Sequence, residues 1–165
     1  MRVWRIATAA QQFTATNLSG AGAARSPGRW NDLGVAMVYC AENRSLAMLE
    51  TLVHVPAAGL PQNRYLIAID IPESVWLARE VLEPGSVDPW VPTWYAIPAA
   101  GISSTFGSEW VRQGRSAVLC VPSVIVPEEC CVLLNPAHLG EAGITAQVVR
   151  RVTYETAWRR PGSFE

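Results

Sequence analysis

One predicted helix carries polar residues beside its apolar face. Leu46, Leu49 and Val53 recur at the i, i+3, i+7 spacing of a single helix face, and Glu50 follows Leu46 by four residues. His54 lies a further four residues along. A carboxylate beside apolar side chains is costly unless it is paired or used in chemistry. Glu50 is therefore a candidate functional carboxylate, although a Glu at the edge of the core and a core histidine fit the same spacing.

A glycine-punctuated stretch at 14–34 supplies a candidate anion site. It is too long for a plain turn and therefore predicts a functional loop. Arg29 follows Gly28, where the missing side chain permits close approach, and a planar guanidinium can hold a phosphate through two hydrogen bonds. The alternative is a surface arginine beside a packed Trp30. The segment Ser19-Gly20-Ala21-Gly22 is only weak evidence for a phosphate loop, because a strand and a helix do not flank it in the required register.

Three further segments carry candidate polar residues. Tyr39 lies in a predicted strand just before the helix of Glu50, so its ring faces either the same pocket or the core. Ser123 lacks the GxSxG context of a nucleophile, which favours a hydroxyl that hydrogen-bonds ligand or backbone. Asn135-Pro136-Ala137-His138 predicts a turn or the start of a helix.

Short apolar segments predict the elements that must position these residues. The predicted strands are Val3–Ile6, Val35–Cys40, Arg64–Ile71, Ala117–Val121, Cys131–Leu134 and Thr145–Tyr154. The predicted helices are Leu46 to about Val55, capped by Asn43 or Ser45 and ended by Pro56, and Ser104–Gln113 with Trp110 on its buried side. Strands dominate without a regular βαβ alternation, so we expect an α+β fold with a mixed or antiparallel sheet.

Length and composition limit the class of protein. The 165 residues suit one compact domain, expected at 1–158 and followed by a tail at 159–165. The absence of a long apolar run and of a secretory signal predicts a cytoplasmic protein. A net charge of −1 gives no reason to expect nucleic-acid or membrane binding. All 13 basic residues are arginine, which excludes lysine-based catalysis.

The cysteine pattern points away from a metal site. Cys40 and Cys120 lie in apolar strands, whereas Cys130 and Cys131 are adjacent, and the chain has no CxxC motif. We expect buried, reduced thiols and neither a disulfide framework nor zinc.

Taken together, the motifs resemble those of the RES-domain family, the toxin component of a type of bacterial toxin–antitoxin pair. The matching segments are Trp4-Arg5-Ile6, Gly-Arg-Trp-Asn-x-x-Gly-x-x-x-Val-Tyr at 28–39, Leu-Ala-x-Leu-Glu-x-Leu-Val-His at 46–54, Gly-Ser-Glu-Trp at 107–110, Val-Pro-Ser at 121–123 and Leu-Leu-Asn-Pro-x-His at 133–138. The resemblance spans nearly the whole chain. The chain departs from the family at Cys131, where Asn is frequent.

The resemblance implies a fold similar to that of ADP-ribosyltransferases of the diphtheria-toxin type. It also implies NAD as substrate, with no separate cofactor. The expected reaction is cleavage of NAD at the nicotinamide–ribose bond by phosphorolysis or hydrolysis, which depletes NAD and arrests growth. Inorganic phosphate would then be a second ligand, and a helix-turn-helix (Xre-like) antitoxin would cover the active site. Transfer of ADP-ribose to a protein is the alternative within enzymes. A non-catalytic interaction module using the Trp-rich stretch, with Trp76, Trp90, Trp94 and Trp110, is the alternative outside them.

The same resemblance assigns roles to individual residues. Arg29, Glu50 and Ser123 match the three residues that name the family. The expected catalytic residues are Arg29 on the NAD phosphates, Tyr39 against the nicotinamide ribose, and Glu50 stabilising the positive charge that forms as nicotinamide leaves. The expected substrate-binding residues are Ser123, His54, Asn135 and Arg5.

Overall fold

A seven-stranded sheet, in the order β4-β5-β6-β2-β1-β3-β7, forms the centre of the molecule. The computed structural model describes residues 1–10, 13–53, 63–83, 94–97, 99 and 101–153. The strands are β1 (Arg2–Thr8), β2 (Val38–Ala41), β3 (Arg64–Asp70), β4 (Glu80–Val81), β5 (Val118–Pro122), β6 (Cys130–Leu134) and β7 (Thr145–Val152). Only β4 and β5 pair in parallel, and the other neighbours are antiparallel. The predicted α+β class with a mixed sheet is confirmed.

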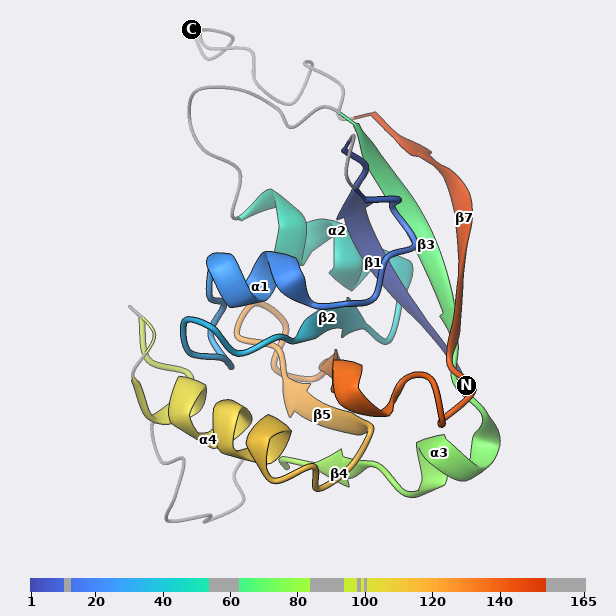
Figure 1. The fold of residues 1–165 in the computed structure, drawn as a ribbon. Coiled ribbons are helices and arrows are strands. Elements are labelled where there is room, and N and C mark those ends of the chain that lie inside the picture. The colour runs from blue at the N-terminus through green and yellow to red at the C-terminus, as the bar shows by residue number, and fades with distance from the viewer. Residues whose placement is uncertain (11–12, 54–62, 84–93, 98, 100, 154–165) are drawn as a thin grey trace, which may run out of the picture.

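The sheet divides between β1 and β2. These strands pair at a single position, Trp4 opposite Ala41, whereas β1 pairs with β3 along its whole length. In Figure 1, β3 and β7 run steeply along one side of the molecule, while β4 and β5 lie across its lower part. The rest of β1 therefore separates from β2, and the space between them becomes available for a cavity.

The helices are α1 (Ala21–Arg25), α2 (Arg44–Leu52), α3 (Glu73–Leu77), α4 (Gly101–Arg112) and the short 3-10 helix η1 (Pro136–His138). Asn43 caps α2, because its Oδ1 accepts a hydrogen bond from the backbone N–H of Leu46 at 2.8 Å. This choice between the two predicted caps agrees with the strong preference for Asn at that position. The sequence gives weaker signals for α1, α3 and β4, which were not predicted.

Helix α2 differs from its predicted packing. Leu46 and Ala47 are buried against Trp4 and Ala41 of the sheet, but Leu49 is 40% exposed and Val53 is 60% exposed. The prediction of a continuous apolar face was therefore wrong beyond the first turns. Only the start of the helix packs over β1 and β2, so Glu50, one turn after Leu46, comes to the border between core and cavity.

Helix α4 packs tightly on the loop that contains Trp30. A Cβ atom at Gly107 would lie 2.0 Å from the carbonyl oxygen of Trp30, so only glycine permits this approach. Trp30 and Trp110 are buried with Met37 in the core beneath this contact. The burial of Trp110 contradicts its proposed part in an exposed interface, since the side chain fills the core. Trp90 lies outside the described residues.

The other core faces the opposite side of the sheet and contains alternate residues of its strands, such as Val3, Val38, Ile67 and Val118. Cys40 and Cys120 are buried there, as predicted. Burial raises the pKa of the Cys40 thiol to about 12 and that of Cys120 to about 11. Over the described part of the chain, no helix is long and apolar enough to cross a bilayer. The predicted tail at 159–165 and the domain boundary at 158 lie outside the described residues.

Candidate active site

A cavity of about 1090 Å³ opens where β1 and β2 separate. One wall is β1 from Arg5 to Thr8, and another is the loop that carries α1 and continues to Trp30. Tyr39 of β2, Glu50 of α2 and Cys131 of β6 line the cavity from the remaining sides. Residues far apart in sequence are therefore gathered around one space.

Among the described residues, two side chains donate hydrogen bonds to the carboxylate of Glu50. The Ser123 hydroxyl donates a hydrogen bond to Glu50 Oε1 at 2.8 Å, and the Cys131 thiol donates to the same oxygen at 3.2 Å. Ser123 directly follows β5, whereas Cys131 lies within β6 opposite Val121 of β5. The paired strands thus bring both donors to one point above the sheet, facing the helix.

Backbone contacts fix the orientation of the Ser123 hydroxyl. Its oxygen accepts hydrogen bonds from the backbone N–H groups of Ile125 and Val126, each at 3.1 Å. A hydroxyl offers one donor and two acceptor positions, so these contacts and the bond to Glu50 use all of them. Of the contacts predicted for this hydroxyl, those to the backbone are present, whereas substrate binding by Ser123 stays a prediction.

The Cys131 thiol is kept protonated by its surroundings. Burial is the main cause that raises its pKa well above the ordinary thiol value, and the charge of Glu50 raises it further. A protonated thiol can donate a hydrogen bond but is a poor nucleophile. This contact was not predicted from sequence, where Cys131 stood out only as a departure from the family pattern.

Tyr39 is anchored through its hydroxyl group. The hydroxyl donates to Asn31 Oδ1 at 2.7 Å and accepts from the backbone N–H of Trp30 at 3.0 Å. Burial raises the pKa of this phenol well above its ordinary value, and the bond from Trp30 opposes the shift. A Cβ atom at Gly28 would lie 2.7 Å from the Tyr39 ring, so glycine allows the loop to cross it. The structure brings Tyr39 to the cavity, one of the two placements that its sequence position left open.

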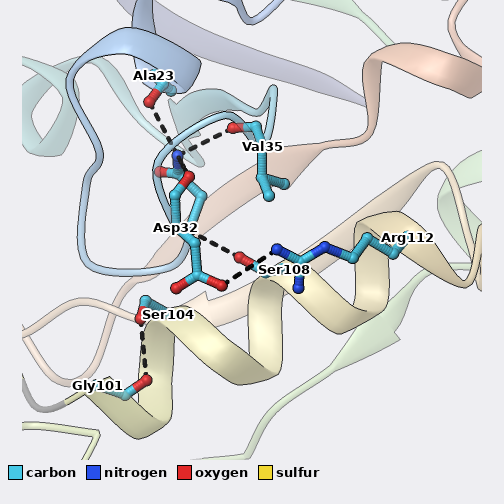
Figure 2. A network of polar contacts seen from close by, with 8 residues as sticks. Ala23, Asp32, Val35, Gly101, Ser104, Ser108 and Arg112 are labelled. Atoms are coloured by element: carbon cyan, nitrogen blue, oxygen red, sulfur yellow. Dashed lines mark hydrogen bonds and ion pairs between the residues drawn. The ribbon is translucent and has the colours of Figure 1, made fainter.

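Asn31 is the central hydrogen-bonding residue of this loop and is 1% exposed. Its Nδ2 shares two protons among the carbonyl oxygens of Ala23, Asp32 and Val35, which lie at 2.9, 3.1 and 3.0 Å. Its Oδ1 accepts from the backbone N–H of Gly28 at 2.9 Å as well as from Tyr39. Figure 2 shows the dashed contacts that reach Ala23 and Val35. The amide therefore sets the path of the whole Gly28–Val35 turn.

Helix α4 holds the same turn from the other side. The backbone N–H of Asp32 donates to Ser108 Oγ at 2.8 Å, and Arg112 forms an ion pair with the Asp32 carboxylate at 3.4 Å (Figure 2). A hydrogen bond from Ser104 is the largest cause that lowers the pKa of Asp32, and Ser108 and Arg112 add to it. These contacts and the close approach at Gly107 fix the loop to α4.

Arg29 lines the cavity but has main-chain partners. Its Nη1 donates to the carbonyl oxygens of Trp94 and Ala96, each at 2.8 Å. These contacts join the Gly28–Asn31 segment to the segment at 94–97. The sequence prediction that Arg29 holds a phosphate stays a prediction.

Other arginines make the cavity positive. Arg5 donates to the carbonyl oxygen of Asn17 at 3.2 Å, and burial lowers the pKa of its guanidinium. Arg25 and Arg64 also line the space. Among the described lining residues, Glu50 is the one acid against four arginines including Arg29. Such an excess of positive charge favours an anionic ligand.

Of the predicted substrate-binding residues that the structure describes, Asn135 and Ser123 do not line this space. Asn135 is buried and caps η1, with its Oδ1 accepting from the Ala137 N–H at 3.1 Å and its Nδ2 donating to the Val111 carbonyl at 3.3 Å. Its amide has the structural role of a helix cap and does not line the cavity. His54 lies outside the described residues. Within the described ranges, no group of three or more His, Cys, Asp or Glu residues is placed to hold a metal ion.

Comparison with known proteins then decides the family. The model of the RES domain matches residues 2–159. The chain belongs to the RES domain family. A Sphingobium protein (strain YBL2) named "Prs ADP-ribosylating toxin" is 51% identical to this RES domain over 152 residues, covering 92% of each chain. A "Toxin Res" of Yersinia enterocolitica is 37% identical over 138 residues, 84% of this chain and 86% of the relative.

A solved structure shares the fold of this RES domain. A chain in the crystal structure of the M. tuberculosis MbcT-MbcA toxin-antitoxin complex aligns with a TM-score of 0.60 and 18% identity. The alignment covers 90% of this chain and 84% of that chain. The architecture described above is therefore one that a known structure also adopts.

Proposed function

We propose that this RES domain is the toxin of a toxin–antitoxin pair and that it transfers ADP-ribose from NAD to a protein. The observation that carries the proposal is the Glu50 carboxylate at the cavity, fixed by Ser123 and Cys131. A carboxylate held in this way is suited to stabilise a positive charge that develops on a bound ligand.

The chemistry needed is rupture of the bond between the nicotinamide nitrogen and the ribose. The bonding electron pair leaves with nicotinamide, which becomes neutral, and positive charge develops on the ribose. Glu50 stabilises that charge, and such an electrostatic contribution is worth about 3–4 kcal/mol in the transition state. A nucleophilic group of the acceptor then bonds to the ribose carbon and releases its proton.

The remaining cavity residues suit the rest of NAD. Its pyrophosphate carries two negative charges, which match the positive charge contributed by Arg29 together with Arg5, Arg25 and Arg64. The ring of Tyr39 offers a flat apolar surface in the cavity that Glu50 also lines, since its hydroxyl is already engaged by Asn31. A volume of about 1090 Å³ is large enough for a dinucleotide.

A protein acceptor is favoured by the relative named "Prs ADP-ribosylating toxin", which is 51% identical over 92% of this chain. We propose Prs as the acceptor on this ground. Phosphorolysis and hydrolysis of NAD begin with the same bond rupture, and they are the alternatives that the experiment must separate.

An antitoxin of the helix-turn-helix (Xre-like) type is the proposed partner. Phe13, Val53, Ile97 and Ile125 line the cavity and are exposed, so the cavity has an apolar rim that a protein can cover. The structural neighbour is itself part of a toxin–antitoxin complex, which supports a partner of this kind.

The test is product analysis after incubation of the purified protein with NAD. Parallel reactions contain buffer alone, inorganic phosphate, or Prs from the same organism with NAD labelled in the adenosine part. We expect nicotinamide release together with label on Prs. Free ADP-ribose or its phosphorylated product, without label on Prs, would assign water or phosphate as acceptor. NAD that stays intact in every reaction would refute the proposal.

A further inference from the structure

We infer that Cys131 is a positioning residue that orients the Glu50 carboxylate for the reaction. The inference rests on the proposed function, in which Glu50 stabilises charge on the ribose. The observation that carries it is the thiol contact at 3.2 Å to the same carboxylate oxygen that Ser123 binds. Cys131 also lines the cavity, so the contact lies at the surface that a ligand meets.

The Cys131 thiol adds a hydrogen-bond donor at the carboxylate oxygen that Ser123 also binds. Ser123 belongs to the turn after β5, and Cys131 belongs to β6. Two donors from different segments converge on Oε1 and fix the carboxylate plane relative to the sheet that forms the cavity.

The thiol suits this task because it remains a donor at neutral pH. Burial and the charge of Glu50 both raise its pKa, so the two groups do not become neighbouring anions. Cys130 provides a matched comparison. Cys130 directly precedes Cys131 in β6, so its side chain lies on the opposite face of the strand. The backbone N–H of Cys130 donates to Glu42 Oε1 at 3.1 Å.

The first experiment compares NAD turnover by Cys131→Ala, Cys131→Ser and Cys130→Ala. We expect Cys131→Ala to lower kcat about fivefold to tenfold with KM for NAD within about twofold, since orientation matters most in the transition state. Cys131→Ser keeps a donor and should restore kcat to within about threefold of wild type, while Cys130→Ala should match wild type. An unchanged kcat in Cys131→Ala, or equal losses in Cys131→Ala and Cys131→Ser, would overturn the inference.

The second experiment does not depend on turnover. In a Cys130→Ala background, the rate of iodoacetamide reaction at residue 131 is followed by peptide mass spectrometry at alkaline pH, with and without Glu50→Gln. If the thiol contacts Glu50, removing the charge lowers the thiol pKa and should speed alkylation about fivefold or more. A rate within about twofold would show that the contact is absent and overturn the inference. If the wild-type protein leaves NAD intact, the proposed function is refuted. The alkylation rates still decide whether the Cys131 thiol contacts Glu50.

Discussion

Replacement of Asn31 by alanine should destabilise the protein strongly through one buried amide. The two N–H groups of the side chain are shared among three carbonyl oxygens, and its oxygen accepts from Gly28 and Tyr39, while the residue is 1% exposed. A neutral hydrogen bond contributes about 1 kcal/mol net, and a buried partner left unpaired costs at least as much. The free energy of unfolding should therefore fall by about 3–5 kcal/mol, a large share of the roughly 5–15 kcal/mol typical of a domain.

The matched control is Asn135→Ala. Asn135 is equally buried, but its amide makes one donated and one accepted side-chain hydrogen bond to described residues. Guanidinium unfolding of both variants should show a loss of about 1–2 kcal/mol for Asn135→Ala and the larger loss for Asn31→Ala. Because Asn31 also anchors Tyr39, its variant should turn over NAD poorly even at a temperature where it is folded. Equal losses of stability in the two variants would refute the reasoning.

Three further predictions follow from the described contacts. Gly107→Ala places a Cβ atom 2.0 Å from the Trp30 carbonyl oxygen and should lower the free energy of unfolding by about 1–3 kcal/mol. Gly101→Ala, whose Cβ atom would meet no atom within 4 Å, should lower it much less. Similar melting temperatures for the two variants would contradict the close approach at Gly107. The folded-state pKa of Cys40 is raised to about 12, so above pH 9 the unfolded chain loses this proton and the folded chain keeps it. Stability should therefore fall by roughly 1 kcal/mol between pH 8 and pH 10 through this thiol, and Cys40→Ala should show a smaller pH-dependent loss in denaturant unfolding. Arg29→Ala removes a proposed phosphate-binding group and should lower kcat/KM for NAD by about 10²–10³, while circular dichroism shows a folded protein. An unchanged kcat/KM would show that Arg29 does not bind the NAD phosphates.

The sequence was informative where a residue's environment follows from local periodicity. The strand segments of alternating and apolar residues, such as Arg64–Ile71 and Ala117–Val121, correspond to β3 and β5 within a residue or two. The i+4 spacing from Leu46 was enough to predict that Glu50 lies at the border of the core, because Leu46 is the most buried anchor of α2. Each of these features depends on neighbours along the chain.

The remaining features depend on contacts between distant segments. The hydrogen bonds of Asn31 reach carbonyl groups whose positions are set by the turn itself, so its central role has no local signal. The contact of Cys131 with Glu50 spans 81 residues and requires β6 and α2 to meet. Likewise, the exposure of Leu49 reflects how far α2 extends over the sheet, which its own sequence does not determine.

The rate of nicotinamide release from NAD by wild type and by Glu50→Gln tests the central claim most directly. The substitution keeps the shape of the side chain and removes its charge, and Glu141→Gln, at an exposed glutamate, controls for the loss of one charge elsewhere. If Glu50 stabilises the developing positive charge, Glu50→Gln should lower kcat by about 10²–10³ with an unchanged melting temperature, and Glu141→Gln should match wild type. A Glu50→Gln variant that releases nicotinamide at the wild-type rate would contradict the account.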